Sequence, residues 1–482
     1  MKSIPYHEIL IPALDALIGN PELLSPDADT KKKADILAIP AHFIMRATEL
    51  RGEQSSRGDA CSELLKMFNT ILGDIHRDNK HFCANGMEIT FIKDQNIART
   101  VRHPNSHGYE PSSSKVETIK AARQYKAELA KNKSDQKLAI LTGDNAMSSL
   151  AYSEGFDVAH INPEVYTGRR KVVMPDEVYM EWMSRGKMTE EEFKAFFPNE
   201  KPLHINEFVE FMAAPGVPFG NNNYFSHIAR FEPGKTPILR QLHHLKEYKG
   251  RIYPRNAGQA MLLEALMISA DEVPIVICPG LFGTGKTYCA TASAYFQTLE
   301  MGDNAPYERI FVVPSEGSPG GRDLGALPGT KDEKIAPMIA PIKDNLYNYL
   351  RAKGDKVKGG KPKTRQDVLR DVNNAIFKVF ELENLQYIGG RSIARSIILY
   401  DEAQALERFQ MRQLLTRIGE GSKMVCLGDP SQVYNRHMNA NSNGLSWAAS
   451  KLAGNPHASV VTLTRDEVER SEAARAIAAC IG

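Results

Sequence analysis

The chain has 482 residues, of which 42% are hydrophobic and 24% are charged, and its formal net charge is +2. A chain of this length is too long for one ordinary hydrophobic core, so we expect two or three domains. The near balance of 60 Lys and Arg against 58 Asp and Glu excludes a globally basic protein, so any nucleic-acid contact must be local.

The six cysteines form no CxxC pair and no tight cluster. They are typical of reduced core residues, so we expect a cytoplasmic protein. The N-terminus has no basic segment followed by a long apolar one, and no apolar run approaches the roughly 18 residues of a membrane span. The sequence therefore favours neither secretion nor membrane insertion.

The first part of the chain, residues 1–165, alternates apolar segments with helical patterns. Residues 7–12 and 137–141 have the composition of strands, and residues 60–72 and 116–129 show the apolar spacing of helices. Strands that alternate with helices predict a small parallel α/β domain.

Residues 166–250 differ, because they are rich in proline and contain a polar run at 220–223. We expect a connector with short strands or helices rather than a third full domain. Four histidines in this part lack the spacing of metal ligands to cysteines or carboxylates, so we interpret them as ordinary side chains. They are His204, His227, His243 and His244.

From residue 251 the alternation of strands and helices returns and continues to residue 482. It is interrupted by a basic segment, residues 353–363, that is poor in apolar groups. We interpret this segment as a mobile surface loop, with nucleic-acid contact as the alternative.

A glycine-rich motif of the form G-x-x-x-x-G-K-T occupies residues 280–287, between a strand-like run at 274–278 and a helical pattern from Tyr288. Such a loop cradles the phosphates of a nucleoside triphosphate, because its glycines let backbone N–H groups point at phosphate oxygens. Lys286 would reach the β- and γ-phosphates, and Thr287 would ligate Mg²⁺. The residues expected to bind ATP here are Gly280, Gly283, Thr284, Gly285, Lys286 and Thr287.

A loop of this kind needs an acid that orders the metal at the end of a neighbouring strand. The apolar run at 396–400 leads directly to Asp401 and Glu402. We expect Asp401 in the Mg²⁺ shell and Glu402 as the group that polarises the attacking water. The distance in sequence from Lys286 leaves room for the intervening strand–helix units of a doubly wound sheet.

A further strand-like run, residues 422–427, ends in polar residues. Asp429 and Gln432 would lie beside the γ-phosphate and could sense its presence. Near the end of the chain, Arg470 could neutralise transition-state charge at its own site or at a neighbour's, with a surface ion pair as the alternative.

Eight motifs in the C-terminal half occur in an order that closely resembles the PhoH-like ATPases, which are RecA-like proteins related to superfamily 1 helicases. The similarity covers residues 251–482. The motifs are Asn256-Ala257-Gly258-Gln259, the loop at 280–287, Leu327-Pro328-Gly329-Thr330 with Glu333-Lys334, Gly390-Arg391-Ser392, Asp401-Glu402-Ala403-Gln404, residues 415–423, Gly428-Asp429-Pro430-Ser431-Gln432, and Ser442-Asn443-Gly444-Leu445 followed by Arg470-Ser471.

This resemblance implies a RecA-like P-loop NTPase domain that hydrolyses ATP with Mg²⁺, acts on single-stranded RNA or DNA, and assembles into a homohexameric ring. It implies that Gln259 reads adenine and that an arginine acts across the subunit interface, either Arg391, Arg417 or Arg470. The chain departs from the family where Pro314-Ser315-Glu316 replaces a usual Arg-Pro, and where Gly389 replaces the first arginine of an Arg-Gly-Arg-Ser motif. These losses put any contact made by the two arginines in doubt.

In one branch of that family a PIN domain of nuclease type precedes the ATPase. Residues 140–147, with Ala151 and residues 155–156, resemble the last strand and helix of a PIN domain, and Asp144 takes the place of a metal-binding aspartate. Such a site needs three or four carboxylates to hold two Mg²⁺ or Mn²⁺ ions.

The other acids of a PIN site match poorly. Ala13 stands at the first catalytic aspartate, two residues before Asp15, and Arg46 stands at the usual glutamate, three residues before Glu49. Residues three apart share a helix face, so Glu49 could substitute, and a shorter loop could place Asp15. Glu117 is a further candidate acid. We favour a degenerate PIN domain that serves as a scaffold or docks nucleic acid.

Three functions follow from these patterns. The first is an ATP-driven motor or remodeller of single-stranded nucleic acid. The second is an active PIN ribonuclease whose ATPase feeds it substrate. The third is a ring-forming scaffold that uses ATP as an assembly switch without nucleic-acid chemistry.

Overall fold

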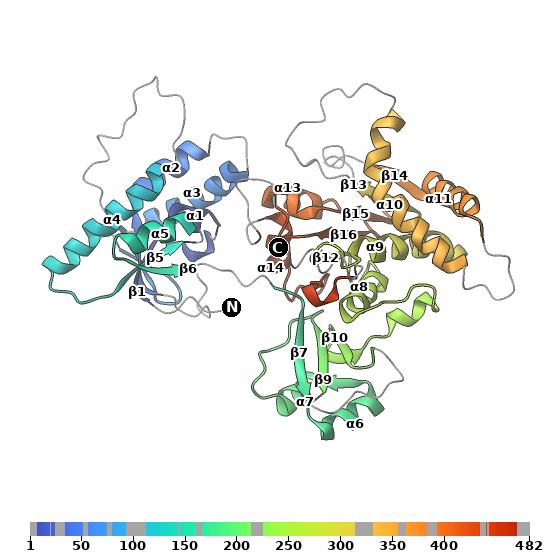
Figure 1. Ribbon diagram of the computed structural model, residues 1–482. Coiled ribbons are helices and arrows are strands. Elements are labelled where there is room, and N and C mark those ends of the chain that lie inside the picture. Colours follow the sequence, from blue (N-terminus) through green and yellow to red (C-terminus); the bar gives the residue numbers. More distant parts are fainter. Residues whose placement is uncertain are drawn as a thin grey trace. The chain divides into compact units, whose positions relative to one another are not determined.

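The computed structural model describes residues 7–19, 21–24, 34–51, 56–74, 80–92, 112–142, 145–160, 166–213, 225–313, 331–354, 363–382, 393–433, 440 and 443–469. The chain divides into two compact units, Met1–Glu164 and Val165–Gly482. Both are mixed α/β structures with parallel strands, which confirms the predicted fold class (Figure 1).

The first unit is built on a six-stranded sheet in the order β3-β4-β2-β1-β5-β6. Neighbouring strands are parallel except for the β3–β4 pair. The strands are β1 (His7–Pro12), β2 (Ala34–Pro40), β3 (Lys80–Phe82), β4 (Glu88–Ile92), β5 (Leu138–Thr142) and β6 (Asp157–His160). The helices are α1 (Leu14–Gly19), α2 (His42–Leu50), α3 (Ser56–Asp74), α4 (Ser112–Lys131) and α5 (Asn145–Ser153).

Alternation along the strands sends side chains to the two faces of this sheet. Leu10 and Leu37 lie in an apolar cluster with α1, α2 and α3. Ile9 and Ile11 lie in a second cluster with α4 and α5. The strands and helices predicted in this unit from periodicity are confirmed within a few residues at each end.

The second unit begins with a five-stranded sheet in the order β7-β9-β10-β11-β8. The strands are β7 (Arg169–Met174), β8 (Lys187–Thr189), β9 (Phe208–Ala213), β10 (Ile228–Glu232) and β11 (Ile238–Gln241), and α6 (Asp176–Arg185) and α7 (Glu190–Phe196) accompany them. Trp182 and Phe211 pack edge to face, and both lie in an apolar cluster that this sheet and its helices form. We call residues 166–250 the middle module; it lies in the same compact unit as the sheet that follows.

The sheet that follows has six parallel strands in the order β14-β13-β15-β16-β12-β17. They are β12 (Ile275–Pro279), β13 (Arg309–Val313), β14 (Phe380–Leu382), β15 (Ser396–Tyr400), β16 (Lys423–Gly428) and β17 (Ala458–Val460). The helices around it include α8 (Ala257–Met267), α9 (Lys286–Tyr295), α10 (Lys331–Gly354), α11 (Arg365–Val379), α13 (Arg408–Leu415) and α14 (Gly444–Lys451).

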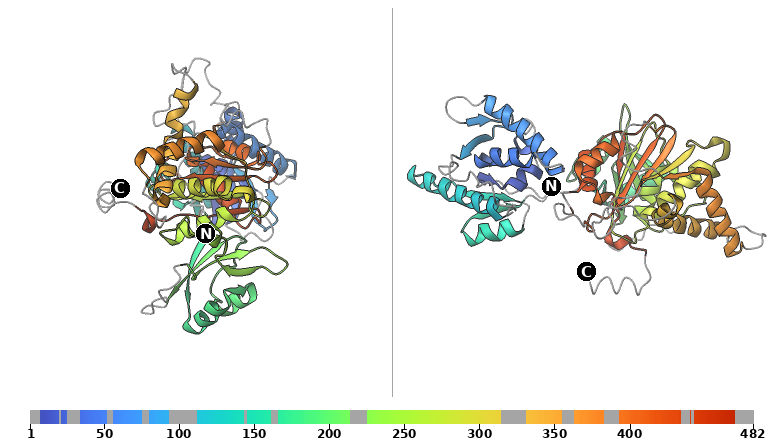
Figure 2. Two further views of the ribbon diagram at one scale, coloured as in Figure 1. Left: turned by 90° about the vertical axis from the view of Figure 1, so that its right-hand side faces the viewer. Right: turned by 90° about the horizontal axis from the view of Figure 1, so that it is seen from above.

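Helices cover both faces of this sheet. Val276 and Cys278 of β12 pack into a cluster with α8 to α11, whereas Ile277 between them packs with α13 and α14. Figure 2 shows the two helix layers on opposite sides of the strands. Because β16 lies between β12 and β15, the carboxyl ends of these three strands are adjacent at one edge. This order positions the candidate site.

Among the described residues, Cys61, Cys83, Cys278, Cys289 and Cys426 are buried free thiols. Burial raises the pKa of the Cys83 thiol to about 11 and that of Cys289 to about 12. These thiols therefore stay protonated, as expected for core residues.

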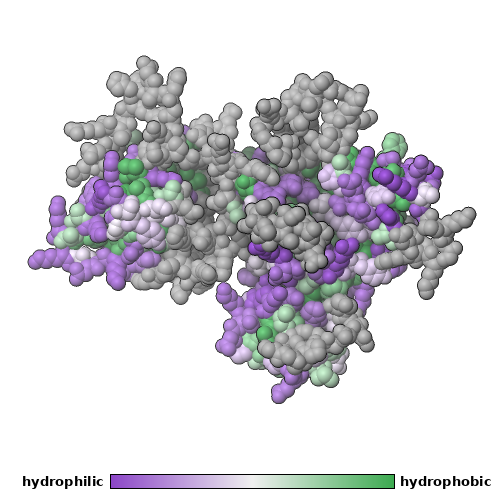
Figure 3. Space-filling model, viewed as in Figure 1, coloured by the Kyte–Doolittle hydropathy of each residue, from purple (hydrophilic) through white to green (hydrophobic). Residues whose placement is uncertain are grey.

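The longer helices carry polar faces; hydrophilic side chains line α4, for example (Figure 3). In the part of the chain that the structure describes, no helix has both the length and the apolar character needed to cross a bilayer.

Candidate nucleotide-binding site

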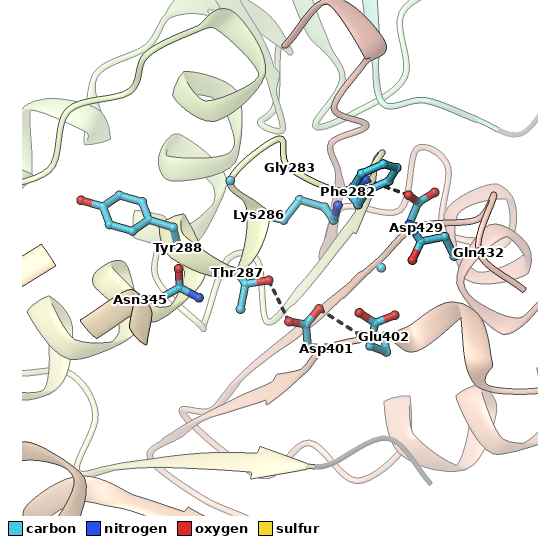
Figure 4. A pocket seen from close by; sticks show the side chains of 12 residues that line it. Phe282, Gly283, Lys286, Thr287, Tyr288, Asn345, Asp401, Glu402, Asp429 and Gln432 are labelled. Carbon is cyan, nitrogen blue, oxygen red and sulfur yellow. Dashed lines mark hydrogen bonds between the residues drawn. The ribbon is translucent and has the colours of Figure 1, made fainter. Parts of the chain in front are cut away.

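A cleft lies where the carboxyl ends of β12, β15 and β16 meet the start of α9, as a doubly wound sheet predicts for a ligand site. Figure 4 shows the charged side chains of the glycine-rich loop, of the β15 end and of the β16 end turned toward one another, with Tyr288 and Asn345 apart from them. The cleft is lined by Phe282, Gly283, Gly285, Lys286, Thr287, Tyr288, Asn345, Asp401, Glu402, Gly428, Asp429 and Gln432.

The loop between β12 and α9 has the backbone of a phosphate cradle. Gly283 and Gly285 have φ of 79° and 84°, which side chains with a Cβ rarely adopt. Gly285 is the N-cap of α9, and the helix begins at Lys286. The free N–H groups and the positive end of the helix dipole therefore face the cleft and favour an anion.

Two hydrogen bonds from outside the loop fix the orientation of its peptide groups. The Gln259 side-chain amide donates to the Thr284 carbonyl at 3.0 Å, and the backbone N–H of Glu469 donates to the Gly283 carbonyl at 2.9 Å. In a trans peptide the N–H points opposite to the C=O. Holding these two carbonyls turns the N–H groups of Thr284 and Gly285 the other way.

Lys286 is nearly buried at the centre of the loop. Its Nζ donates to the carbonyls of Gly280 at 2.7 Å and Leu281 at 2.8 Å. A third contact, to Thr284 Oγ1, is long at 3.5 Å. An ammonium has three donors, so one remains for a phosphate oxygen without loss of the two carbonyl bonds.

The Thr287 hydroxyl and the Asp401 carboxylate are bonded to each other. Thr287 Oγ1 donates to Asp401 Oδ2 at 2.7 Å, although the two residues are 114 positions apart in the chain. A hydroxyl and a carboxylate oxygen side by side are the hard oxygen donors that Mg²⁺ prefers. The residues present therefore fit the metal that the sequence predicts.

Glu402 stands in the left-handed region with φ of 60°, which is uncommon for a residue other than glycine. Its side chain is exposed toward the cleft, and its Oε2 accepts a hydrogen bond from Gln404 Nε2 at 2.6 Å. Gln404 is 1% exposed, and its Oε1 accepts the N–H of Asp429 at 3.0 Å. Gln404 thus joins the ends of β15 and β16.

The sequence pattern predicted no role for Gln404. It appeared only as the fourth residue of the motif that begins at Asp401. The signal that could have found it is a buried amide two residues after an acid at a strand end, since a buried amide must find partners for both its N–H₂ and its oxygen.

Asp429 is bound to the loop itself. Its Oδ2 accepts the backbone N–H of Phe282 at 2.7 Å, and its Oδ1 accepts the N–H of Ser431 at 2.9 Å. Gln432 lines the same cleft. The end of β16 is therefore tied directly to the segment expected to hold phosphate.

Residues 251–482 match the family model described as "PhoH-like protein". We therefore call residues 251–482 the PhoH-like domain, after the family that they match. The resemblance stated from its motifs is confirmed, and with it a domain of the P-loop NTPase type. The parallel sheet and the glycine-rich loop between β12 and α9 agree with a domain of this type.

Curated relatives carry the same family name. Protein PhoH2 of Bacillus subtilis (strain 168) is 32% identical over 309 residues, which cover 64% of this chain and 62% of that protein. Protein PhoH2 of Mycolicibacterium smegmatis is 31% identical over 213 residues, or 44% of each chain. The PhoH-like protein of Bacillus subtilis is 31% identical over 226 residues, covering 47% of this chain and 62% of that protein. The chain thus spans less than two thirds of the length of these relatives.

A solved structure titled "The structure of PRRSV helicase" aligns with 50% of this chain and 40% of its own, at 11% identity and a TM-score of 0.17. That similarity is too low to support any inference.

Gln259 was predicted to read adenine, but its Nε2 is bonded to Thr284 and its Oε1 accepts the N–H of Arg255 at 2.9 Å. It does not line the cleft. Arg470 lies outside the described residues, as do Arg391 and residues 355–362 of the basic segment.

The acids predicted for the first unit have mixed positions. Asp144 lies outside the described residues. Asp15 follows β1 and accepts a hydrogen bond from Thr142 Oγ1, at the end of β5, at 3.3 Å. Glu49 is ion-paired with Arg46, and Glu117 lies 3.7 Å from His42. The Arg46 cation therefore neutralises Glu49, the acid that was expected to replace the glutamate missing at position 46.

The described residues contain one cluster with the spacing of metal ligands, which sequence spacing did not suggest: His243, His244 and Glu264, whose ligand atoms lie within 4.8 Å of one another. The buried Glu264 carboxylate accepts the backbone N–H groups of His243, His244 and Leu245 at 2.7 to 3.1 Å. It thereby satisfies the start of the short helix His244–Tyr248. This structural role accounts for the cluster.

Proposed function

We propose that the protein binds and hydrolyses ATP and uses the energy as a motor or remodeller of single-stranded nucleic acid, RNA in the first place and DNA as the alternative. The observation that carries the ATPase part is the Thr287–Asp401 hydrogen bond at 2.7 Å beside the glycine-rich loop. It joins the two halves of the site from distant parts of the chain.

The geometry supports a division of roles among the residues of the cleft. The N–H groups of the loop and the Lys286 ammonium bind the β- and γ-phosphates. Thr287 and Asp401 would hold Mg²⁺, which neutralises charge on the phosphate oxygens when bound. Glu402 accepts a proton from the attacking water, and Gln404 orients its carboxylate.

Asp429 and Gln432 are suited to report the presence of the γ-phosphate. Asp429 is bonded to Phe282 in the loop, and its N–H is bonded to Gln404. A shift of the loop on phosphate binding or release would therefore reach both the end of β16 and the Glu402 carboxylate.

The nucleic-acid and ring-forming parts of the proposal rest on the resemblance to helicase-related ATPases. In such proteins an arginine, here Arg470 or an alternative, completes a neighbour's site within a homohexamer. Glu469, which precedes Arg470 in the sequence, donates its backbone N–H to the Gly283 carbonyl at 2.9 Å.

The test is ATP turnover by the full chain with Mg²⁺, with and without single-stranded RNA or DNA of equal length. We expect turnover in the absence of nucleic acid and a clear stimulation by one of the two strands. Turnover that no RNA or DNA changes would refute the motor and leave an ATPase with another partner.

A further inference from the structure

A buried triplet of charges links the middle module to the PhoH-like domain. Arg169, the first residue of β7, donates to Glu210 of β9 at 2.8 Å and to both carboxylate oxygens of Glu467 at 2.8 and 2.9 Å. The side chains of Arg169, Glu210 and Glu467 are only 6%, 11% and 8% exposed. Buried charges must be paired and hydrogen-bonded to be tolerated, so the three side chains depend on one another.

Glu467 has further partners on its own side of this contact. Its carboxylate accepts the N–H of Gly258, in the first turn of α8, at 2.7 Å and the N–H of Thr464 at 2.8 Å. A Cβ at position 258 would lie 2.4 Å from Glu467 Oε2, so this approach requires glycine. Glu467 thus holds the first turn of α8 and residues 464–467 together.

Both of these segments lead to residues that are hydrogen-bonded to the phosphate loop. Gln259, the neighbour of Gly258, donates to the Thr284 carbonyl, and Glu469, two residues after Glu467, donates to the Gly283 carbonyl. These are the two bonds that orient the N–H groups of the loop. Arg169 is therefore connected to the phosphate loop through the Glu467 carboxylate and the two segments that Glu467 holds.

The middle module makes further hydrogen bonds to the edge of the sheet in the PhoH-like domain. The N–H of Thr462 donates to the Thr167 carbonyl at 2.9 Å beside the edge strand β17. The Asn206 side chain donates to the carbonyls of Pro456 and Ala458 at 2.9 and 3.0 Å, on either side of the start of that strand. The module therefore adjoins β17 through hydrogen bonds as well as through the buried charges.

We propose that Arg169 and Glu467 are positioning residues that couple the middle module to the nucleotide site, so that Arg169 sets the affinity of the phosphate loop. The inference rests on the proposed nucleotide binding. Loss of the Arg169 charge leaves Glu467 without its main partner, and the Gln259 and Glu469 contacts to the loop loosen. Neither residue lines the cleft.

The test compares Arg169→Gln with Arg170→Gln as a matched control. Arg170 is the next residue of β7 and makes an equivalent bidentate pair with Glu207 at 2.7 and 2.8 Å, but that pair lies within the middle module. The dissociation constant of Mg-ADP is measured by calorimetry for the full chain, at a temperature where circular dichroism shows every variant folded.

We expect Arg169→Gln to weaken Mg-ADP binding about tenfold and Arg170→Gln to leave it nearly unchanged. Arg169→Lys, which keeps the charge but reaches fewer oxygens, should be intermediate and also serves if Arg169→Gln does not fold. Equal dissociation constants for wild type, Arg169→Lys and Arg169→Gln would overturn this inference but not the proposed function. A wild-type chain that binds neither ADP nor ATP would overturn the proposed function as well.

Discussion

At the scale of single residues, Gln404 makes the sharpest prediction. The change Gln404→Leu leaves an apolar side chain of comparable length but removes the bonds to Glu402 and to the N–H of Asp429. Because the Glu402 carboxylate is then free to turn, we expect kcat for ATP to fall about 10- to 100-fold while nucleotide affinity changes little. Steady-state turnover and Mg-ADP binding measure the two effects separately.

Gln413→Leu, on the exposed face of α13, is the control for Gln404→Leu and should behave as wild type. If Gln404→Leu turns over ATP at the wild-type rate, Glu402 does not need this partner and the assigned role is wrong.

Much of the candidate site could be predicted from the sequence, because the spacing of residues within each motif indicates their chemical roles. Lys286 and Thr287 follow from the glycine motif, and Asp401 from an acid at the end of an apolar run. The partners of Gln259 and Gln404 could not be predicted. Which backbone groups these amides meet depends on how α8 and the β16 end approach the loop, and no local pattern encodes that approach.

At the scale of secondary-structure elements, Lys423 shows how β16 is joined to α8. Its fully buried Nζ donates to the carbonyls of Ala265 and Leu266 at 3.3 and 3.1 Å and also to that of Ile268, at the C-terminal end of α8. Burial, together with the charge of Arg230, lowers the pKa of Lys423 to about 7, against a smaller opposing effect of Glu272. The lysine caps the helix that carries Gln259 at its other end.

A pH dependence of stability follows from Lys423. Between about pH 7 and its ordinary value of 10.5 the unfolded chain holds a proton that the folded chain has released, so the free energy of unfolding rises with pH across this window. The variant Lys423→Met lacks this contribution and also removes the N–H donors to the three carbonyls, two of which a neutral amine can satisfy, at a cost of about 1–3 kcal/mol. Urea unfolding at pH 7.5 and 9.5 should therefore show a wild-type advantage that is larger at the higher pH. An advantage that shrinks would contradict the lowered pKa.

The strands β12, β15 and β16 could be predicted because they are short, apolar and followed by glycine or polar residues. Their order could not, since the insertion of β16 between β12 and β15 is a property of the whole sheet. The middle module differs again. Its strands are three to six residues long and alternate with prolines and charges, so the pattern favoured a connector, whereas the structure shows a five-stranded sheet with an apolar cluster. Tertiary packing decides such short strands.

At the scale of the whole molecule, the first unit makes a prediction about nuclease activity. Its resemblance to a PIN domain stays a prediction. The ion pair between Glu49 and Arg46 makes a full cluster of metal-binding acids less favourable. Because a site short of carboxylates binds metal weakly, we expect no more RNA cleavage with Mn²⁺ or Mg²⁺ from wild type than from Asp144→Ala. Gel analysis of labelled single-stranded RNA measures this. Cleavage by wild type that Asp144→Ala abolishes would show an active nuclease instead.

The central claim is that one site, assembled from the ends of β12, β15 and β16, binds and hydrolyses ATP. Single-turnover hydrolysis of ATP by wild type, Lys286→Ala and Glu402→Gln tests it most directly, with ATP binding followed in the same samples. We predict that Lys286→Ala loses both binding and hydrolysis, and that Glu402→Gln still binds ATP but hydrolyses it at least about 100-fold more slowly. Hydrolysis at the wild-type rate in both variants would contradict the account.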